Sequence, residues 1–190
     1  MRDLAGIVLA GGAARRLSGV DKPMLEIGGK PLLRRAVDAL AAASPVVVVG
    51  PERRGFPEVR WTREDPPGGG PVAALAAGVA LVTSPLVAVL AGDLVAVSSS
   101  TVDTLRAALG GHDGAVLVDP GGHRQWLIGV WRTESLRAAL PDDPGGASLR
   151  AVLSGLDIVG VPAAAGEGAD VDTPADLARH TGSSQPSHGS

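Results

Sequence analysis

Short apolar runs alternate along the chain with segments whose apolar residues recur at helical spacing. The runs Leu4–Ala10, Val46–Val49 and Leu86–Ala91 contain no polar residue, which predicts strands that are covered on both faces. The segments Pro31–Ala43 and Pro71–Val82 predict helices, and the proline that opens each suits a first helical position. Strand and helix therefore alternate from the start of the chain.

The second half of the chain continues this alternation. It predicts strands over Ala115–Val118, Trp126–Trp131 and Ile158–Val161, and helices over Thr133–Leu140, Ser148–Leu156, the segment from its cap Ser100 to about Leu109, and a segment beginning at Thr173-Pro174-Ala175-Asp176. Such a pattern favours a single-domain α/β fold: a mostly parallel, Rossmann-like sheet with helices on both faces. In such sheets ligands bind beyond the carboxyl ends of the strands, so we expect the loops after Ala10, Val49 and Ala91 to converge on one crevice.

Composition narrows the class of protein. Of the 190 residues 45% are hydrophobic, with one Phe, three Trp and no Tyr, so aliphatic residues must build the core. We expect one domain over 1–179 and a disordered Ser/Gly-rich tail over 180–190. A net charge of −3 argues against coating nucleic acid, yet it allows a small polyanion held by local cations. Without cysteine there is no disulfide or zinc–thiolate site. With neither a secretory leader nor a membrane span recognisable, we expect a cytoplasmic monomer or weak homo-oligomer.

Flexibility and positive charge are concentrated directly after the first predicted strand. Gly11 and Gly12 allow a sharp turn and the close approach of a ligand, and backbone N–H groups in such a turn form a concavity for anions. Arg15, Arg16 and Lys22 follow within a dozen positions, so the loop suits a triphosphate. The same residue types would also suit a turn with a solvated basic face. Further along, a pair of arginines at 53 and 54 is expected to be such a solvated surface pair.

Two familiar phosphate-binding motifs do not fit this loop. Pro31 follows Gly28-Gly29-Lys30 where a P-loop needs Ser or Thr, and adjacent glycines break the dinucleotide fingerprint. The stretch instead resembles the nucleotidyltransferase loop LAGG-x-x-x-R-(hydrophobic)-G-x-x-K-x, here Leu9-Ala10-Gly11-Gly12, Arg16-Leu17, Gly19 and Asp21-Lys22-Pro23, with Ser18 as one extra residue. The specific likeness is to molybdenum cofactor guanylyltransferases and their relatives, and it extends from Ala5 to about Leu177.

The resemblance implies a magnesium-dependent nucleotide site. The segment Glu64–Pro71 is similar to the family's D-x-x-P-G-x-G-P-L, which reaches the purine and ribose side of the nucleotide, and Asp170–Pro174 matches its terminal (N/D)-x-(N/D)-T-P. The implied nucleotide-binding residues are Leu9, Ala10, Gly11, Gly12, Lys22, Asp65, Gly69 and Asp93; the implied catalytic cations are Arg16 and Lys22; the implied Mg²⁺ ligands are Asp93 and Asp172.

Each of these positions also has a plainer explanation. An aspartate such as Asp93 can simply cap a strand-to-loop turn, and a Thr-Pro helix start already accounts for Asp172. Relatives continue D-x-P after the metal-binding aspartate, whereas this chain has the apolar Leu94-Val95-Ala96-Val97, which puts the roles of neighbouring residues in doubt. Trp126 stands where relatives have a proline near the acceptor; it could stack on a flat ring or pack in the core.

By this resemblance the reaction transfers GMP from GTP to a molybdopterin-type acceptor and releases pyrophosphate. The ionised acceptor phosphate attacks the α-phosphorus, so positioning and charge neutralisation carry the chemistry without a protein nucleophile. Two alternatives stay open. A cytidylyl- or sugar-nucleotidyltransferase could use the same loop, and the pair Asp170/Asp172 favours cytidyl transfer. A catalytically weak nucleotide-binding protein would account for the altered loop after Asp93.

Overall fold

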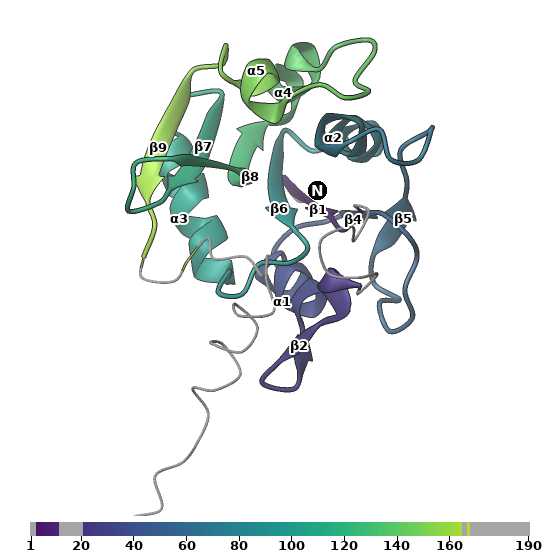
Figure 1. Ribbon diagram of the computed structural model, residues 1–190. Coiled ribbons are helices and arrows are strands. Elements are labelled where there is room, and N and C mark those ends of the chain that lie inside the picture. Colours follow the sequence, from purple (N-terminus) through teal and green to yellow (C-terminus); the bar gives the residue numbers. More distant parts are fainter. Residues whose placement is uncertain (1–2, 12–20, 165–166, 168–190) are drawn as a thin grey trace, which may run out of the picture.

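A central β-sheet forms the middle layer of this protein, as a computed structural model describing residues 3–11, 21–164 and 167 shows (Figure 1). Its seven strands lie in the order β5-β4-β1-β6-β8-β7-β9. Their bounds are β1 Leu4–Leu9, β4 Val46–Val49, β5 Arg60–Thr62, β6 Leu86–Ala91, β7 Gly114–Val118, β8 Arg124–Arg132 and β9 Ile158–Pro162. Within this sheet β8 runs antiparallel to both neighbours, and the other pairings are parallel. The sheet is therefore mostly parallel, as predicted.

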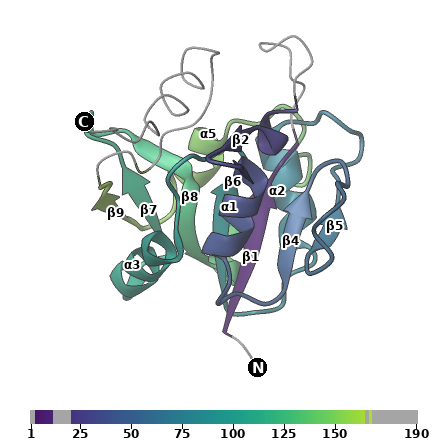
Figure 2. The same cartoon turned by 90° about the horizontal axis from the view of Figure 1, so that it is seen from below.

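Helices cover both faces of the sheet. The helices are α1 Leu32–Ala39, α2 Pro71–Val79, α3 Ser99–Leu109, α4 Thr133–Ala139 and α5 Leu149–Leu153; a 3-10 turn, η1, spans Lys22–Met24, and a small hairpin joins β2 Glu26–Ile27 to β3 Lys30–Pro31. Figure 1 shows α2, α4 and α5 on one face and α1 and α3 on the other, and Figure 2 is seen from the side of α1 and α3. Within the described residues, no helix is long and apolar enough to span a membrane.

Two apolar clusters explain this three-layer arrangement. Along β1, Ala5, Ile7 and Leu9 belong to the cluster beneath α2, α4 and α5, whereas Leu4 and Val8 belong to the cluster beneath α1 and α3. Neighbouring side chains of a strand point to opposite faces, so a run without polar residues can bury both. The entire strand is buried.

Several element boundaries differ from the sequence prediction. The prediction that Ser100 caps a helix is wrong, because α3 begins at Ser99 and Ser98 is its cap, with Ser98 N donating to Thr101 Oγ1 at 3.3 Å. Pro31 precedes α1 instead of opening it, since it pairs with Glu26 in the hairpin. The short edge strand β5 and the hairpin were not predicted. The expected helix at Thr173 and the expected tail lie outside the described residues.

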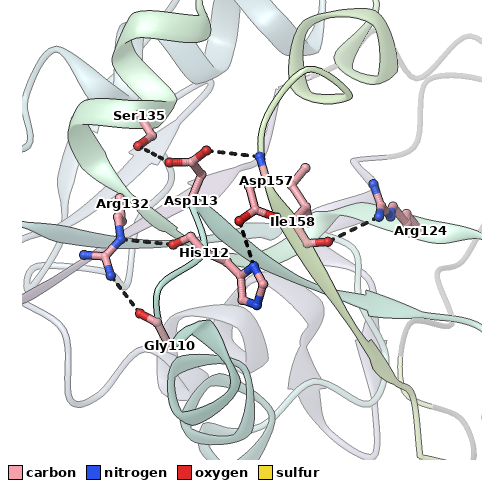
Figure 3. A network of polar contacts seen from close by, with 8 residues as sticks. All are labelled: Gly110, His112, Asp113, Arg124, Arg132, Ser135, Asp157 and Ile158. Atoms are coloured by element: carbon pink, nitrogen blue, oxygen red, sulfur yellow. Dashed lines mark hydrogen bonds and ion pairs between the residues drawn. The ribbon is translucent and has the colours of Figure 1, made fainter.

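A polar network closes the edge of the sheet where β7 and β9 begin (Figure 3). Asp113 accepts hydrogen bonds from Ser135 Oγ at 2.6 Å and from the Asp157 backbone N–H at 3.0 Å. These two contacts, the first of them the larger, lower the pKa of Asp113. Arg132 donates to the carbonyls of Gly110 and His112 at 2.7 and 3.0 Å. The network joins α3, α4, β7 and β9 at the edge opposite the carboxyl ends of β1, β4 and β6.

Candidate active site

The loops after β1, β4 and β6 converge at one edge of the sheet, as the sequence predicts. Leu9 is in register with Val49 on one side and with Ala91 on the other. Beyond the register, Ala10 N donates to Val49 O at 2.8 Å and Gly92 N donates to Leu9 O at 2.9 Å. The backbone that leads from Ala10 into Gly11 is thus held at the centre of the edge where a ligand of a parallel sheet binds.

Two glycines allow the backbones at this edge to approach closely. Gly50 has φ +149°, and a Cβ there would lie 2.8 Å from the carbonyl carbon of Ala10 and from the nitrogen of Gly11. A Cβ at Gly92 would lie 3.0 Å from the Cβ of Ala10. Side chains at these positions would push the strand ends apart, so the glycines keep the loops together. Asp93 follows Gly92 directly and so leaves the sheet beside Ala10.

The loop after Asp93 is anchored by the apolar residues that distinguish it from the family pattern. Leu94 and Val97 are buried in the cluster beneath α1 and α3. Val95 is buried against Ile27 and Leu32 in a smaller cluster to which Leu25 also belongs. The apolar sequence therefore seats the loop, and Val95 packs it against the segment that follows Lys22. This packing brings the segments that carry the two predicted residues, Lys22 and Asp93, to the same side of the crevice.

Lys22 opens the 3-10 turn η1. Leu25 N donates to Lys22 O at 3.0 Å and Met24 N donates to Asp21 O at 2.9 Å, while Pro23 fixes φ at the second residue of the turn. The turn contacts α1. A lysine on a short, hydrogen-bonded turn is better fixed at its backbone than one in an open loop, which suits a cation that must meet a phosphate.

The expectation of a solvated pair at Arg53 and Arg54 is wrong for Arg53. The Arg53 side chain is only 10% exposed, and its Nε and Nη2 donate to the two oxygens of Asp21 at 2.8 and 2.6 Å. Nη2 also donates to the carbonyl of Ala10 at 3.2 Å. Arg54 is exposed, as expected. Arg53 is thus a component of the crevice that sequence reasoning missed, because its partners lie far away in the sequence.

In the segment Glu64–Pro71 the structure buries Glu64 and leaves its neighbour Asp65 exposed. Glu64 is 8% exposed and Asp65 is exposed. Glu64 Oε1 accepts from Gly68 N at 3.0 Å, and Oε2 is buried with no hydrogen-bond partner among the described residues. Oε2 lies 3.9 Å from the position that a Cβ of Gly11 would take. Counting back from Pro71, Glu64 also holds the acidic position of D-x-x-P-G-x-G-P-L, a signal in the sequence that could have found it.

Glycines shape the remainder of that segment. Gly68 and Gly70 have φ +88° and +91°, and Gly70 caps the nine-residue α2. Gly69, a predicted nucleotide-binding residue, accepts a hydrogen bond at its carbonyl from Gly146 N at 2.8 Å, so the loop before α5 supports it from behind. The first turn of α2 directs backbone N–H groups toward this loop, which favours an oxygen of a ligand.

The β7–β8 hairpin lies at the same edge, because β8 begins beside the end of β6. Asp119 accepts from Gln125 Nε2 at 2.9 Å and from the His123 backbone N–H at 2.9 Å, and the latter contact is the chief cause of its lowered pKa. Trp126 is half-buried against the cluster beneath α2, with the Arg124 guanidinium 5.8 Å from its ring centroid. The packing alternative for Trp126 thus has a structural basis, and its contact with an acceptor stays a prediction.

Some predicted site residues cannot be placed. Gly12, Arg15, Arg16, Asp170 and Asp172 lie outside the described residues, and their predicted roles stay predictions. Among the described residues, no group of three or more His, Cys, Asp or Glu side chains forms a metal cluster. A magnesium ion bound to a nucleotide needs only one or two carboxylates, because phosphate oxygens and water supply the other ligands. The half-buried Asp93 at the end of β6 fits that requirement.

Fold and crevice together define a nucleotidyltransferase. The chain belongs to the MobA-like NTP transferase domain family, whose profile matches residues 6–159. It is 29% identical to the "Probable molybdenum cofactor guanylyltransferase" of Natronomonas pharaonis, over 94% of this chain and 97% of that protein. This family membership confirms both the resemblance and the enzyme class expected from the sequence.

Solved structures share the fold at low sequence identity. The molybdopterin-guanine dinucleotide biosynthesis protein A of Archaeoglobus fulgidus is 21% identical, with a TM-score of 0.72 over 94% of this chain and 97% of that chain. The 2-C-methyl-D-erythritol 4-phosphate cytidylyltransferase of Thermus thermophilus is 19% identical, with a TM-score of 0.70 over 93% and 96% of the two chains. The fold by itself therefore does not select the base that is transferred.

Proposed function

We propose that this nucleotidyltransferase moves GMP from GTP to a molybdopterin-type acceptor and releases pyrophosphate, with Mg²⁺ as cofactor. The observation that carries the choice of base is the buried Oε2 of Glu64, which lacks a partner among the described residues and lies close to Gly11. A buried carboxylate oxygen without a donor is costly, so a ligand that supplies the donor is favoured. The edge of guanine carries adjacent N–H groups, which can donate hydrogen bonds to a carboxylate oxygen. The name of the Natronomonas relative supports the same base.

The residues of the crevice divide the chemistry between them. The new bond forms between a phosphate oxygen of the acceptor and the α-phosphorus, and the bond from that phosphorus to the pyrophosphate oxygen breaks. Gly11 and Gly12 would present backbone N–H groups to the phosphates, and Leu9 and Ala10 would line the nucleotide site at the strand end that leads into this turn. Lys22, and Arg16 with it, would offset the charge that builds on the leaving pyrophosphate. No proton has to be removed from an acceptor phosphate that is already ionised.

Asp93 would hold the magnesium ion, with Asp172 as the proposed second ligand. A bound Mg²⁺ neutralises phosphate charge and orients the nucleotide for in-line transfer. Asp93 is fitted for this because Gly92 places it beside Ala10 and the buried Leu94 and Val95 fix the chain that follows. Asp65, exposed at the rim, would contact the nucleoside from the outside, and Gly69 would allow the base to approach the backbone.

Thermal denaturation with GTP, CTP, ATP and UTP, each with and without Mg²⁺, tests the choice of base. A ligand that binds only the folded protein stabilises it by about 2.7 kcal/mol at a hundredfold excess over Kd. We expect GTP with Mg²⁺ to raise the Tm most. An equal or larger rise with CTP would favour the cytidylyltransferase alternative, and no rise with any nucleotide would favour a protein that has lost nucleotide binding.

Glu64→Gln tests the residue that carries this proposal. An amide has one acceptor oxygen and one donor nitrogen, so it cannot accept from both the Gly68 N–H and an N–H of guanine. We therefore expect the preference for GTP over ATP to fall about tenfold, the effect of losing one charge-assisted hydrogen bond of about 1.5 kcal/mol. Glu134→Gln is the matched control, since it makes the same chemical change at an exposed glutamate of α4, at the edge of the sheet opposite the crevice; we expect it to keep the preference. If Glu64→Gln binds the four nucleotides as the parent does, Glu64 does not read the base.

A further inference from the structure

Arg53 contacts residues on both sides of the glycine-rich loop. Its guanidinium donates to both oxygens of Asp21, the residue directly before Lys22, at 2.6 and 2.8 Å. The same group donates to the carbonyl of Ala10, the residue directly before Gly11, at 3.2 Å. A single side chain therefore joins the point where the chain leaves β1 to the point where it enters the 3-10 turn of Lys22.

The geometry of Arg53 is that of a buried clamp. Its side chain is 10% exposed while that of Asp21 is 49% exposed, and Nη1 donates to the carbonyl of Pro51 at 3.1 Å. Exposed ion pairs contribute little because both side chains are mobile and solvated. Here the planar fork is held on one side by backbone carbonyls, so the carboxylate that it binds is fixed in direction as well as distance.

The base of the clamp is rigid. Arg53 follows the end of β4 by four residues, and Gly50 lies between them with its backbone against Ala10 and Gly11. Gly50 N donates to Thr62 O at 2.9 Å, which ties this turn to β5 as well. Because β1, β4 and β5 are neighbours in the sheet, the sheet itself fixes the guanidinium relative to the crevice.

We infer that Arg53 is a positioning residue for nucleotidyl transfer: through Asp21 it orients Lys22, and through the Ala10 carbonyl it orients the backbone at Gly11. The inference rests on the role proposed for Lys22. Arg53 itself acts without touching the phosphates. Lysine cannot replace it fully, because an ammonium group lacks the planar fork that holds two carboxylate oxygens and a carbonyl at once.

Steady-state pyrophosphate release from GTP, Mg²⁺ and molybdopterin as acceptor compares the parent with four variants: Arg53→Ala, Arg53→Lys, Asp21→Asn and the double variant Asp21→Asn/Arg53→Ala. A displacement of about 1 Å at a reacting group can cost on the order of 100-fold. We expect Arg53→Ala to lower kcat by about that factor with a smaller change in KM, and Arg53→Lys to recover part of it. The double variant should be no slower than Arg53→Ala alone, because both changes break one clamp. Arg54→Ala, the exposed neighbour, is the control and should keep the parent's rate.

Thermal denaturation of each variant separates positioning from stability. The inference is overturned if Arg53→Ala retains the parent's kcat, or if its loss of activity equals its loss of folded protein. It is also overturned if the fold-losses in kcat of Arg53→Ala and Asp21→Asn multiply in the double variant. Should Arg53→Ala not fold, Arg53→Lys and Asp21→Asn answer the same question. Calorimetric titration with pyrophosphate and Mg²⁺ keeps the inference separate from the choice of GTP: we expect about tenfold weaker binding by Arg53→Lys even if the parent uses another nucleotide, and equal binding would overturn the clamp.

Discussion

Lys22 is placed by its own turn and by the residues next to it in space. The 3-10 turn holds its backbone through the bond from Leu25 N, and Asp21 before it is bound to Arg53. A lysine ammonium is a compact charge on a long flexible stem, so such constraints determine where it can meet a phosphate. At the scale of single residues, the proposed chemistry depends on this one charge more than on any other described residue.

Lys22→Ala tests that dependence. Loss of a group that stabilises charge in the transition state typically costs on the order of 100- to 1,000-fold in kcat, and we expect a loss in this range. The Tm should change little, because the side chain is only partly buried. Lys22→Arg, which keeps the charge, should recover part of the rate. A Lys22→Ala protein that turns over at the parent's rate would remove Lys22 from the mechanism.

Single residues of the site differ in how far the sequence alone could identify them. Lys22, Gly11 and Asp93 belong to local motifs, whose residue spacing can be recognised in the sequence without the structure. Arg53 could not be predicted, since its role arises from contacts with Ala10 and Asp21 that only the folded chain creates. Glu64 was within reach of prediction, because the family motif counted from Pro71 points to it, but the adjacent Asp65 is equally acidic.

At the scale of elements, close approach of strand ends builds the crevice. Gly50 lets the turn after β4 pass over Ala10 and Gly11, and Gly92 lets the turn after β6 do so from the other side. The buried Val95 then packs the loop after Asp93 onto Ile27 and Leu32. The turns after three strands thus meet at the backbone of Ala10, and the β2–β3 hairpin packs onto the loop that follows Asp93.

Gly50→Ala should disturb both stability and the site. The substitution places a Cβ 2.8 Å from backbone atoms and forces an L-residue to φ +149°, so we expect a loss of about 2–4 kcal/mol in the free energy of unfolding, at the high end for point substitutions. Gly55→Ala is the matched control: φ there is +92°, but nothing lies within 4 Å of the added Cβ. Urea denaturation measures both. Equal losses in the two variants would show that the close contact with Ala10 has no cost of its own.

Element prediction succeeded where the chain is uniformly apolar. The strands Val46–Val49 and Leu86–Ala91 have the predicted bounds, because a short apolar run has few alternatives in an α/β fold. The edge strand Arg60–Thr62 was missed, since it is short, two of its three residues are polar, and it is held by pairing with β4. The serine that caps α3 was misplaced by two residues because Ser98, Ser99 and Ser100 are equivalent by sequence and Thr101 decides between them.

At the scale of the whole molecule, the two edges of the sheet have different tasks. The carboxyl edge of β1, β4 and β6 gathers the residues of the crevice, whereas the opposite edge carries the polar network of Asp113, Arg132, Ser135 and Asp157 (Figure 3). This network joins β7, β8 and β9 of the central sheet to α3 and α4. Breaking this network should therefore lower the free energy of unfolding and leave kcat unchanged.

Acid should weaken this network when it protonates Asp113. Because hydrogen bonds from Ser135 and the Asp157 N–H lower the pKa of Asp113, its stabilisation is complete above the unfolded pKa of about 3.9 and is lost as pH falls through the lower folded value. Ser135→Ala removes the larger cause. We expect the variant to be less stable than the parent at pH 7, with the difference shrinking below about pH 4. Denaturation across pH measures this, and a difference that stays constant with pH would contradict the titration of Asp113 as its source.

Transfer of label from α-phosphate-labelled GTP to molybdopterin, with CTP assayed in parallel, tests the central claim most directly. With Mg²⁺ the account predicts a guanylylated acceptor and one pyrophosphate for each label transferred, little transfer from CTP, and none after the metal is chelated. Transfer from CTP in preference to GTP, or no transfer from either nucleotide by a protein shown to be folded, would contradict it.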